Sequence, residues 1–266
     1  YTTLFRSVTL TADLACNNQS GLVVSASNTT INLNGHTLSC TGGGVGGTCQ
    51  PVAGSSNIAG IRSANFSNVK ILGPGVITGF GTGIYLEKGT AFTVSNVEIT
   101  GPATTMANNN RYVSYGVFID DAACPISIFG SDTTPAALVT FNQISNQSSG
   151  ILVRDSVGNS AEPAQIRNNT ISNCGMGVQA AWTKTALVEN NQLTNCKAGV
   201  VVNQALLDWT TGERTRVENP FRIVPTVGVT VSQNRYTNVT GPKIALTENA
   251  GAVFGDGYTP NLRTVP

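Results

Sequence analysis

Apolar and polar residues alternate in short runs, and these runs recur along the chain about every 22 residues. Each run starts at a glycine and ends in an Asn-rich turn. The clearest pair of copies is residues 166–174 and 188–196, which are similar position by position. Alternation with a period of two is typical of a β-strand, and a repeat of this length is typical of a solenoid. The pattern therefore predicts one elongated all-β domain built from stacked coils.

The leading residues align eight segments of the chain, which predicts about eight coils. They are Gly21, Gly60, Gly83, Gly116, Gly150, Gly177, Gly199 and, with the glycine replaced, Lys243. The first and third residues after the glycine are mostly branched aliphatics, so we expect them to point into the core. The second and fourth residues then point outward. One parallel sheet is expected to run the length of the domain.

Two further apolar columns follow in each coil. A second sheet is predicted at Ile31, Ile71, Val94, Val139, Ile166 and Val188, followed by a column at Leu38, Ile77, Ile99, Ile144, Ile171, Leu193 and Tyr236. Two residues before the last column stand Asn142, Asn169, Asn191 and Asn234. Stacked Asn side chains can satisfy the polar groups of a buried turn, so we predict an Asn ladder. His36, the chain's single histidine, takes this position in the first coil and is interpreted as a ladder member, not a catalytic base.

The run NTTINLNGHTL at residues 28–38 is common near the start of right-handed parallel β-helices. With the repeat, it makes residues 8–250 resemble the superfamily of pectate lyases, polygalacturonases and carbohydrate-binding or sugar-hydrolase repeat proteins. The resemblance implies a single-domain right-handed parallel β-helix, with residues 251–266 as a C-terminal tail. It implies extracellular polysaccharide chemistry as the commonest role, although phage tailspikes, adhesins and periplasmic accessory proteins share the fold. Function must therefore be argued from the site.

Charge is scarce in this chain: 11% of residues are charged and the net charge is +1. No basic field is present to attract nucleic acid, and no apolar run is long enough to span a membrane. A polysaccharide is the expected partner, and the sequence predicts no oligomeric state.

Residues 1–7 look like the translation of a sequencing adapter. We therefore expect a non-native N-terminus on a truncated gene of metagenomic origin, with any signal peptide missing.

Six cysteines are present, and four of them occur at matching positions of successive repeats. Cys174 and Cys196 form one such pair, and Cys16 and Cys40 the other. Adjacent coils stack about 4.8 Å apart, within the Cα separation that a disulfide needs. Two disulfides are therefore predicted, which favours a secreted or periplasmic protein. Reduced, stacked cysteines are the alternative.

Five insertions interrupt the repeat, at residues 41–59, 102–115, 121–136, 156–163 and 205–226. All of them join one end or the other of the glycine-headed sheet, so its outward side chains would form the floor of a walled groove. That floor is the part of the chain richest in charge. It carries Glu87, Lys88, Asp120, Asp121, Arg154 and Asp155 within three coils.

A polysaccharide lyase acting on an acidic sugar by β-elimination is the leading hypothesis for this groove. The carboxylates of Glu87, Asp120, Asp121 and Asp155 would hold Ca²⁺. Lys88 or Arg154 would act as the base. Tyr85 would be the acid and Arg62 would clamp the substrate carboxylate. The lyase leads because bases and carboxylates are interleaved.

A glycoside hydrolase is the second hypothesis, because paired carboxylates suffice for it. Glu87 and Asp120, one coil apart, suit the separation of about 5–5.5 Å in retaining enzymes, and Glu87 and Asp155 suit the wider separation of inverting enzymes. The polygalacturonase motifs Asn-Thr-Asp, Gly-His-Gly and Arg-Ile-Lys are absent, as is the Asp-Pro-His motif of alginate epimerases.

A non-catalytic carbohydrate-binding or structural solenoid is the third hypothesis. The residues expected to contact sugar, in this or either enzyme, are Arg62, Phe118, Gln179, Trp182 and Trp209. The acidic and basic side chains between Glu87 and Asp155 would then be ordinary cross-strand ion pairs on a solvated sheet.

Overall fold

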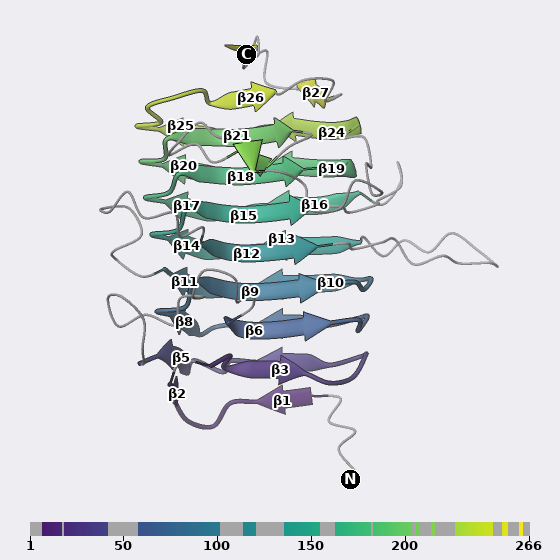
Figure 1. Cartoon of the computed structure of the whole chain (residues 1–266), viewed down its shortest axis with the longest axis vertical. Coiled ribbons are helices and arrows are strands. Elements are labelled where there is room, and N and C mark those ends of the chain that lie inside the picture. Colours follow the sequence, from purple (N-terminus) through teal and green to yellow (C-terminus); the bar gives the residue numbers. More distant parts are fainter. Residues whose placement is uncertain are drawn as a thin grey trace, which may run out of the picture.

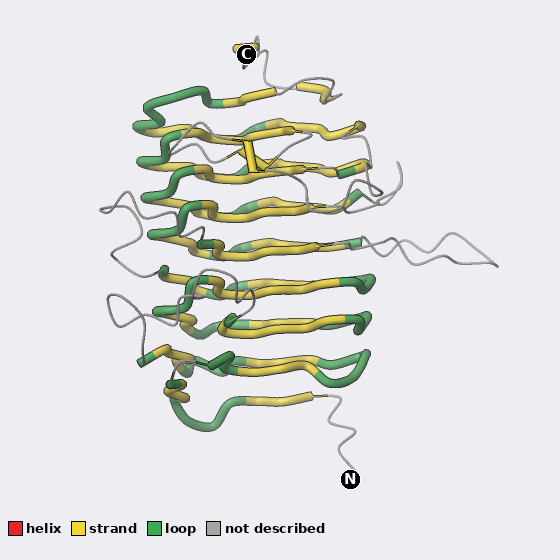
Figure 2. The backbone as a smooth tube through the Cα atoms, in the orientation of Figure 1, coloured by secondary structure: helices red, strands yellow, loops and turns green. Residues whose placement is uncertain are grey.

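The computed structural model describes residues 7–17, 19–41, 58–101, 114–120, 136–154, 163–181, 183–203, 206–207, 214–215, 227–246, 252–254 and 261–262. Three parallel sheets of nine, eight and nine strands run side by side along the domain. Figures 1 and 2 show the coils stacked along the longest axis, with the N- and C-terminal ends at opposite ends of the stack. These described residues contain no helix and therefore no helix that could cross a membrane. The predicted single-domain right-handed parallel β-helix of about eight coils is confirmed.

Each of the first eight coils contributes one strand to each sheet, and β27 and β28 add a last strand to two of them. The glycine-headed sheet holds β3 (Leu22–Val24), β6 (Ala59–Ala64), β9 (Thr82–Glu87), β12 (Tyr115–Asp120), β15 (Ser149–Arg154), β18 (Met176–Ala181), β21 (Ala198–Asn203), β26 (Ile244–Leu246) and β28 (Asn261–Leu262). The second sheet holds β1 (Ser7–Thr9), β4 (Thr30–Asn32), β7 (Lys70–Leu72), β10 (Phe92–Ser95), β13 (Ala137–Thr140), β16 (Ala164–Arg167), β19 (Lys184–Glu189), β24 (Val227–Ser232) and β27 (Ala252–Phe254). The third sheet holds β2 (Leu14–Cys16), β5 (Thr37–Cys40), β8 (Val76–Thr78), β11 (Glu98–Thr100), β14 (Gln143–Ser145), β17 (Thr170–Ser172), β20 (Gln192–Thr194) and β25 (Arg235–Thr237). A separate antiparallel pair joins β22 (Leu206–Leu207) to β23 (Arg214–Thr215).

The core consists of vertical columns of identical or similar side chains, one from each coil. Ile84, Val117, Ile151 and Val178 are register partners on successive strands, and all four are fully buried. Branched aliphatics suit these positions because they pack well against neighbours on a pleated surface. The inward column predicted after the leading glycine is therefore confirmed.

The leading glycine marks the corner at which the third sheet passes into the glycine-headed sheet. A Cβ on Gly83 would lie 2.5 Å from Cγ2 of Ile99 and 2.7 Å from the carbonyl oxygen of Gly116. Gly116 meets the same obstacles in the next coil, from Ile144 and Gly150. The backbone thus approaches both the core and the neighbouring coil too closely for any side chain, which explains why glycine recurs here.

The predicted Asn ladder is present and buried. Nδ2 of Asn142 donates to Oδ1 of Asn169 at 3.0 Å, Asn169 donates to Asn191 at 2.9 Å, and Asn191 donates to Asn234 at 2.9 Å. The Oδ1 atoms of Asn169, Asn191 and Asn234 also accept the backbone N–H of the Asn in the preceding coil, and Oδ1 of Asn142 accepts that of Val97. Each Nδ2 donates as well to a backbone carbonyl of the preceding coil, for example from Asn169 to Val139 at 3.0 Å. The ladder therefore satisfies turns that water cannot reach.

His36 occupies the ladder position of its coil but makes a different contact. Its Nδ1 lies 3.3 Å from Oδ1 of Asp13, and its side chain is 28% exposed. The N–H of Thr37 donates to the same oxygen at 2.9 Å. These two contacts lower the pKa of Asp13. His36 is thus a partly exposed partner of Asp13 and does not extend the buried ladder.

One of the two predicted disulfides forms and the other does not. Cys174 and Cys196 are joined, with a Cα–Cα distance of 4.6 Å. Cys16 and Cys40 are register partners as expected, but Cys16 is a free, buried thiol, so the disulfide that Cys40 forms is not to Cys16. The predicted Cys16–Cys40 bond was wrong. Register brings the two Cα atoms together, but it does not determine whether the two sulfur atoms bond to each other. Burial raises the pKa of the Cys16 thiol, which makes it unreactive.

We expect the Asn ladder to carry a measurable share of stability. Replacing Asn169 with Ala removes hydrogen bonds to both neighbouring coils, so the free energy of unfolding should fall by about 2–4 kcal/mol at roughly 1 kcal/mol per bond. Urea unfolding followed by circular dichroism measures the loss. Thr170→Ala is the control, since Thr170 is the next residue and is exposed. Equal losses for the two variants would contradict the ladder's role.

Candidate functional site

Three neighbouring strands place the predicted site residues on the outer face of the glycine-headed sheet. Glu87, Asp120 and Arg154 are register partners at the ends of β9, β12 and β15. Tyr85 and Phe118 are partners two residues earlier. The sheet therefore builds two outward columns, as the repeat predicts, and the side chains of one column lie about 4.8 Å from their neighbours.

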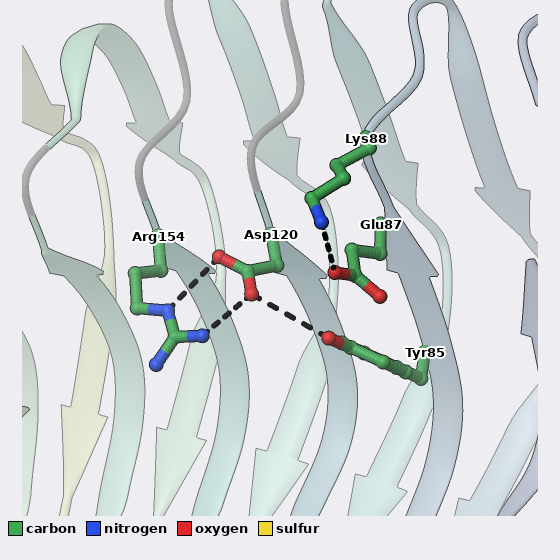
Figure 3. Close-up of polar contacts among 5 residues, drawn as sticks. All are labelled: Tyr85, Glu87, Lys88, Asp120 and Arg154. Atoms are coloured by element: carbon green, nitrogen blue, oxygen red, sulfur yellow. Dashed lines mark hydrogen bonds and ion pairs between the residues drawn. The ribbon is translucent and has the colours of Figure 1, made fainter. Parts of the chain in front are cut away.

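Asp120 and Arg154 form a two-point ion pair. Nε of Arg154 donates to Oδ1 of Asp120 at 2.9 Å, and Nη2 donates to Oδ2 at 2.5 Å (Figure 3). The side chains are 10% and 28% exposed. This parallel arrangement is the strong form of an arginine–carboxylate contact. Both carboxylate oxygens of Asp120 are therefore engaged within the protein.

Tyr85 lies beside this pair and points its phenol toward it. The hydroxyl donates to Oδ2 of Asp120 at 3.5 Å, a long bond seen in Figure 3. Burial raises the pKa of Tyr85 well above its ordinary range, and the negative charges of Asp120 and Glu87 raise it further. The phenol consequently stays protonated and acts as a hydrogen-bond donor.

Glu87 and Lys88 form a second, more exposed ion pair at the end of β9. Nζ of Lys88 lies 3.2 Å from Oε1 of Glu87, with side chains 48% and 19% exposed. Lys88 has a φ of 51°, so the chain turns out of the strand at this residue, and its ammonium reaches back over Glu87 in Figure 3. The cation of Lys88 is therefore occupied by a neighbouring carboxylate.

An aromatic cluster lies next to the two ion pairs. Phe118 contacts Tyr85 with ring centroids 5.0 Å apart, and it contacts Tyr115 at 4.8 Å. The guanidinium of Arg154 lies 5.0 Å from the Phe118 ring centre, and that of Arg62 lies 5.9 Å from the Tyr85 ring centre. Such distances are typical of cation–π contacts. Phe118 and Tyr115 are only partly buried, so the cluster is reachable from solvent.

Tyr115 was missed by sequence reasoning. It stands one residue before the leading glycine. The outward positions were assigned only to residues after the glycine, so none was predicted here. The chain turns its corner at Gly116, whose own Cβ would point inward, and the residue before it consequently faces out beside Phe118. The positions preceding the other glycines form a third outward column by the same geometry, with Thr82 and Ser149 as the register partners of Tyr115.

The C-terminal half of this face is covered. Leu152 and Ala181 are fully buried although they occupy outward columns, and Gln179 is 1% exposed. Val23, at the N-terminal end of the same face, is 66% exposed. The predicted continuous groove floor is therefore wrong in this half. Gln179 lacks the open surface that its predicted role in substrate binding requires.

The predicted calcium set is not assembled by the described residues. Asp121 and Asp155 lie outside them, as do Trp182 and Trp209. Glu87 and Asp120 are register partners, but each is paired with a cation, and cations repel Ca²⁺. In the described ranges no group of three His, Cys, Asp or Glu side chains could hold a metal ion.

The arrangement suits binding better than proton transfer. A lyase base must be free to take a proton, whereas Arg154 and Lys88 are both ion-paired. A two-carboxylate hydrolase needs one oxygen of Asp120 free to meet the sugar, whereas Arg154 holds both. The partly exposed rings of Tyr115 and Phe118 remain on the surface, and aromatic rings hold a ligand without reacting with it.

We expect the Asp120–Arg154 pair to be strongly coupled in stability. Asp120→Ala and Arg154→Ala should each lower the free energy of unfolding by about 2–4 kcal/mol, because each removes both bonds of an ion pair that lies mostly out of solvent. The double variant should lose less than the two losses combined. Chemical denaturation of all four proteins measures this coupling.

The Glu87–Lys88 pair provides the matched control for that experiment. It is adjacent and more exposed, so its coupling should stay below about 1 kcal/mol. Similar coupling energies in both pairs would show that the two-point geometry of Asp120 and Arg154 adds nothing to the free energy of unfolding.

The comparison with known proteins gives one family. No individual curated protein matches the sequence. A family model described as "Periplasmic copper-binding protein (NosD)" matches residues 61–241, which is more than half of the chain. The matched range includes every described residue of the site, from Arg62 in β6 to Arg154 in β15. The β-helix described above thus belongs to the periplasmic copper-binding protein (NosD) family.

Proposed function

We propose that this protein binds a polysaccharide on the N-terminal half of the outer face of the glycine-headed sheet. One observation carries the proposal: the partly exposed rings of Tyr115 and Phe118 form a continuous aromatic cluster on that face, packed on the buried ring of Tyr85. Aromatic rings provide large contact area at little cost in side-chain entropy, and their faces accept the C–H-rich faces of sugar rings. Tyr115 adds a polar hydroxyl to the cluster.

An extracytoplasmic location supports this proposal. The Cys174–Cys196 disulfide joins two neighbouring coils, and such bonds persist in oxidising compartments. The family is described as periplasmic, in agreement with the secreted or periplasmic location expected from the cysteines. Polysaccharides of the cell envelope or of the surroundings would be accessible there.

Copper binding, which the family description names, does not fit the described residues. Copper in proteins is held by imidazole, thiolate and thioether groups. The ring of His36 is paired with Asp13, and Cys174 is joined to Cys196. Met176 is packed in a buried apolar cluster. Among the described residues, no group of three His, Cys, Asp or Glu side chains lies close enough together to hold a metal ion. We therefore assign no copper chemistry to this face.

Binding isotherms with a panel of acidic and neutral soluble polysaccharides test the proposal. We expect measurable affinity for at least one of them. Phe118→Ala should weaken it about 2- to 10-fold, the loss that corresponds to one aromatic contact of 0.5–1.5 kcal/mol. Phe141→Ala is the matched control, because Phe141 is an aromatic residue 61% exposed on another part of the coil. No affinity across the panel, or equal loss in both variants, would contradict the proposal.

The same mixtures test the competing hypothesis of β-elimination. Elimination creates an unsaturated uronate that absorbs ultraviolet light, and hydrolysis creates reducing ends without that absorbance. We expect neither product, because Arg154 and Lys88 are ion-paired. Growth of ultraviolet absorbance that Asp120→Ala abolishes would instead establish the lyase.

A further inference from the structure

Arg62 and Arg154 stand on the same face of the same sheet, but their hydrogen bonds differ. Arg154 uses Nε and Nη2 to hold both oxygens of Asp120. Nε of Arg62 is buried and has no hydrogen-bond partner. Within the described ranges, the one contact of Arg62 is the cation–π approach to Tyr85. The guanidinium of Arg154 is thus held by a carboxylate. Three coils away, the guanidinium of Arg62 has no carboxylate partner among the described residues.

A buried donor without a partner costs about 1–3 kcal/mol, and more when the group is charged. Native proteins rarely retain such a group unless it has a use. The structure offers Arg62 no carboxylate: its register partners are Val23 and Tyr85, and Glu87 is paired with Lys88. Nε itself is buried, so an acceptor that comes from outside these residues would meet the terminal nitrogens of the guanidinium.

The surroundings of Arg62 indicate which chemical group would complete it. Tyr85 lies directly beneath the guanidinium and holds it over the ring. The high pKa of Tyr85 keeps its phenol neutral, so no tyrosinate charge neutralises the cation. Val23, on the other side, is 66% exposed and leaves the approach open. A planar carboxylate can accept two parallel bonds from the two terminal nitrogens of a guanidinium.

We infer that Arg62 is an anion subsite that recognises a carboxylate of the bound polysaccharide, which makes the ligand a uronic-acid polymer. The inference rests on the proposed function, since it assumes that a glycan lies on this face. Arg62 and Phe118 are two coils apart, about 10 Å along the stack. A chain lying along the face would thus contact Arg62 through its carboxylate and the aromatic cluster through a nearby sugar ring.

The test compares polygalacturonate with its fully methyl-esterified form, which has the same backbone without the charge. Wild-type protein should bind the acid about 10- to 100-fold more tightly than the ester, the range for a charged pair at a partly desolvated site. Arg62→Ala should reduce this preference to near unity while retaining the affinity for the ester. Arg62→Lys should recover part of the preference, because Lys supplies the charge without the planar fork.

Two controls, Arg235→Ala and dextran sulfate, separate the possible failures. Arg235→Ala removes an equal charge from the exposed β25 and should leave the preference unchanged. Equal binding of acid and ester by wild-type protein would overturn the inference while leaving the proposed function intact, whereas binding of neither would overturn both. Dextran sulfate that competes as well as polygalacturonate would show that charge alone is recognised, and it would overturn the assignment to a carboxylate.

Discussion

The in-register stacking of coils about 4.8 Å apart is the constraint on which the rest of this structure depends. A side chain that points inward has the corresponding side chain of the next coil directly above it. Each inward position must therefore be occupied by residues that tolerate their own kind as neighbours. Branched aliphatics do so by packing, and Asn does so by hydrogen bonding from Asn142 through Asn234. Glycine does so at corners such as Gly83, where no Cβ fits.

The outer face is free of this constraint, and there the chain departs from repetition. Along the outward columns of the glycine-headed sheet, no two neighbouring coils from β6 to β15 carry the same side chains. Charge and aromatic rings are concentrated on this stretch in a protein with 11% charged residues. Two internal ion pairs neutralise most of the charge. The face therefore offers the aromatic surface of Phe118 and Tyr115 and the guanidinium of Arg62 in place of reactive groups.

Sequence periodicity predicted what the stacking constraint controls. The inward columns, the Asn ladder and the Cys174–Cys196 bond follow from position in the repeat, because register carries each residue onto its counterpart. Register does not control what a side chain bonds to. Cys16 thus lies opposite Cys40 without bonding to it, and Asp120 pairs with Arg154 where a metal ion was expected. Burial on the outer face depends on more than one coil, so the covered position of Gln179 was not predictable from alternation. The outward position of Tyr115 follows from a bend at Gly116 that alternation does not represent.

Hydroxyl-radical footprinting with and without polygalacturonate tests the central claim that the ligand lies across the aromatic cluster. Radicals oxidise aromatic side chains according to their exposure, and mass spectrometry reports each site separately. The account predicts that bound polysaccharide lowers the oxidation of Phe118 and Tyr115 and leaves Phe141, on another part of the coil, unchanged. Protection of Phe141, with Phe118 and Tyr115 as reactive as in the free protein, would place the ligand elsewhere and contradict the account.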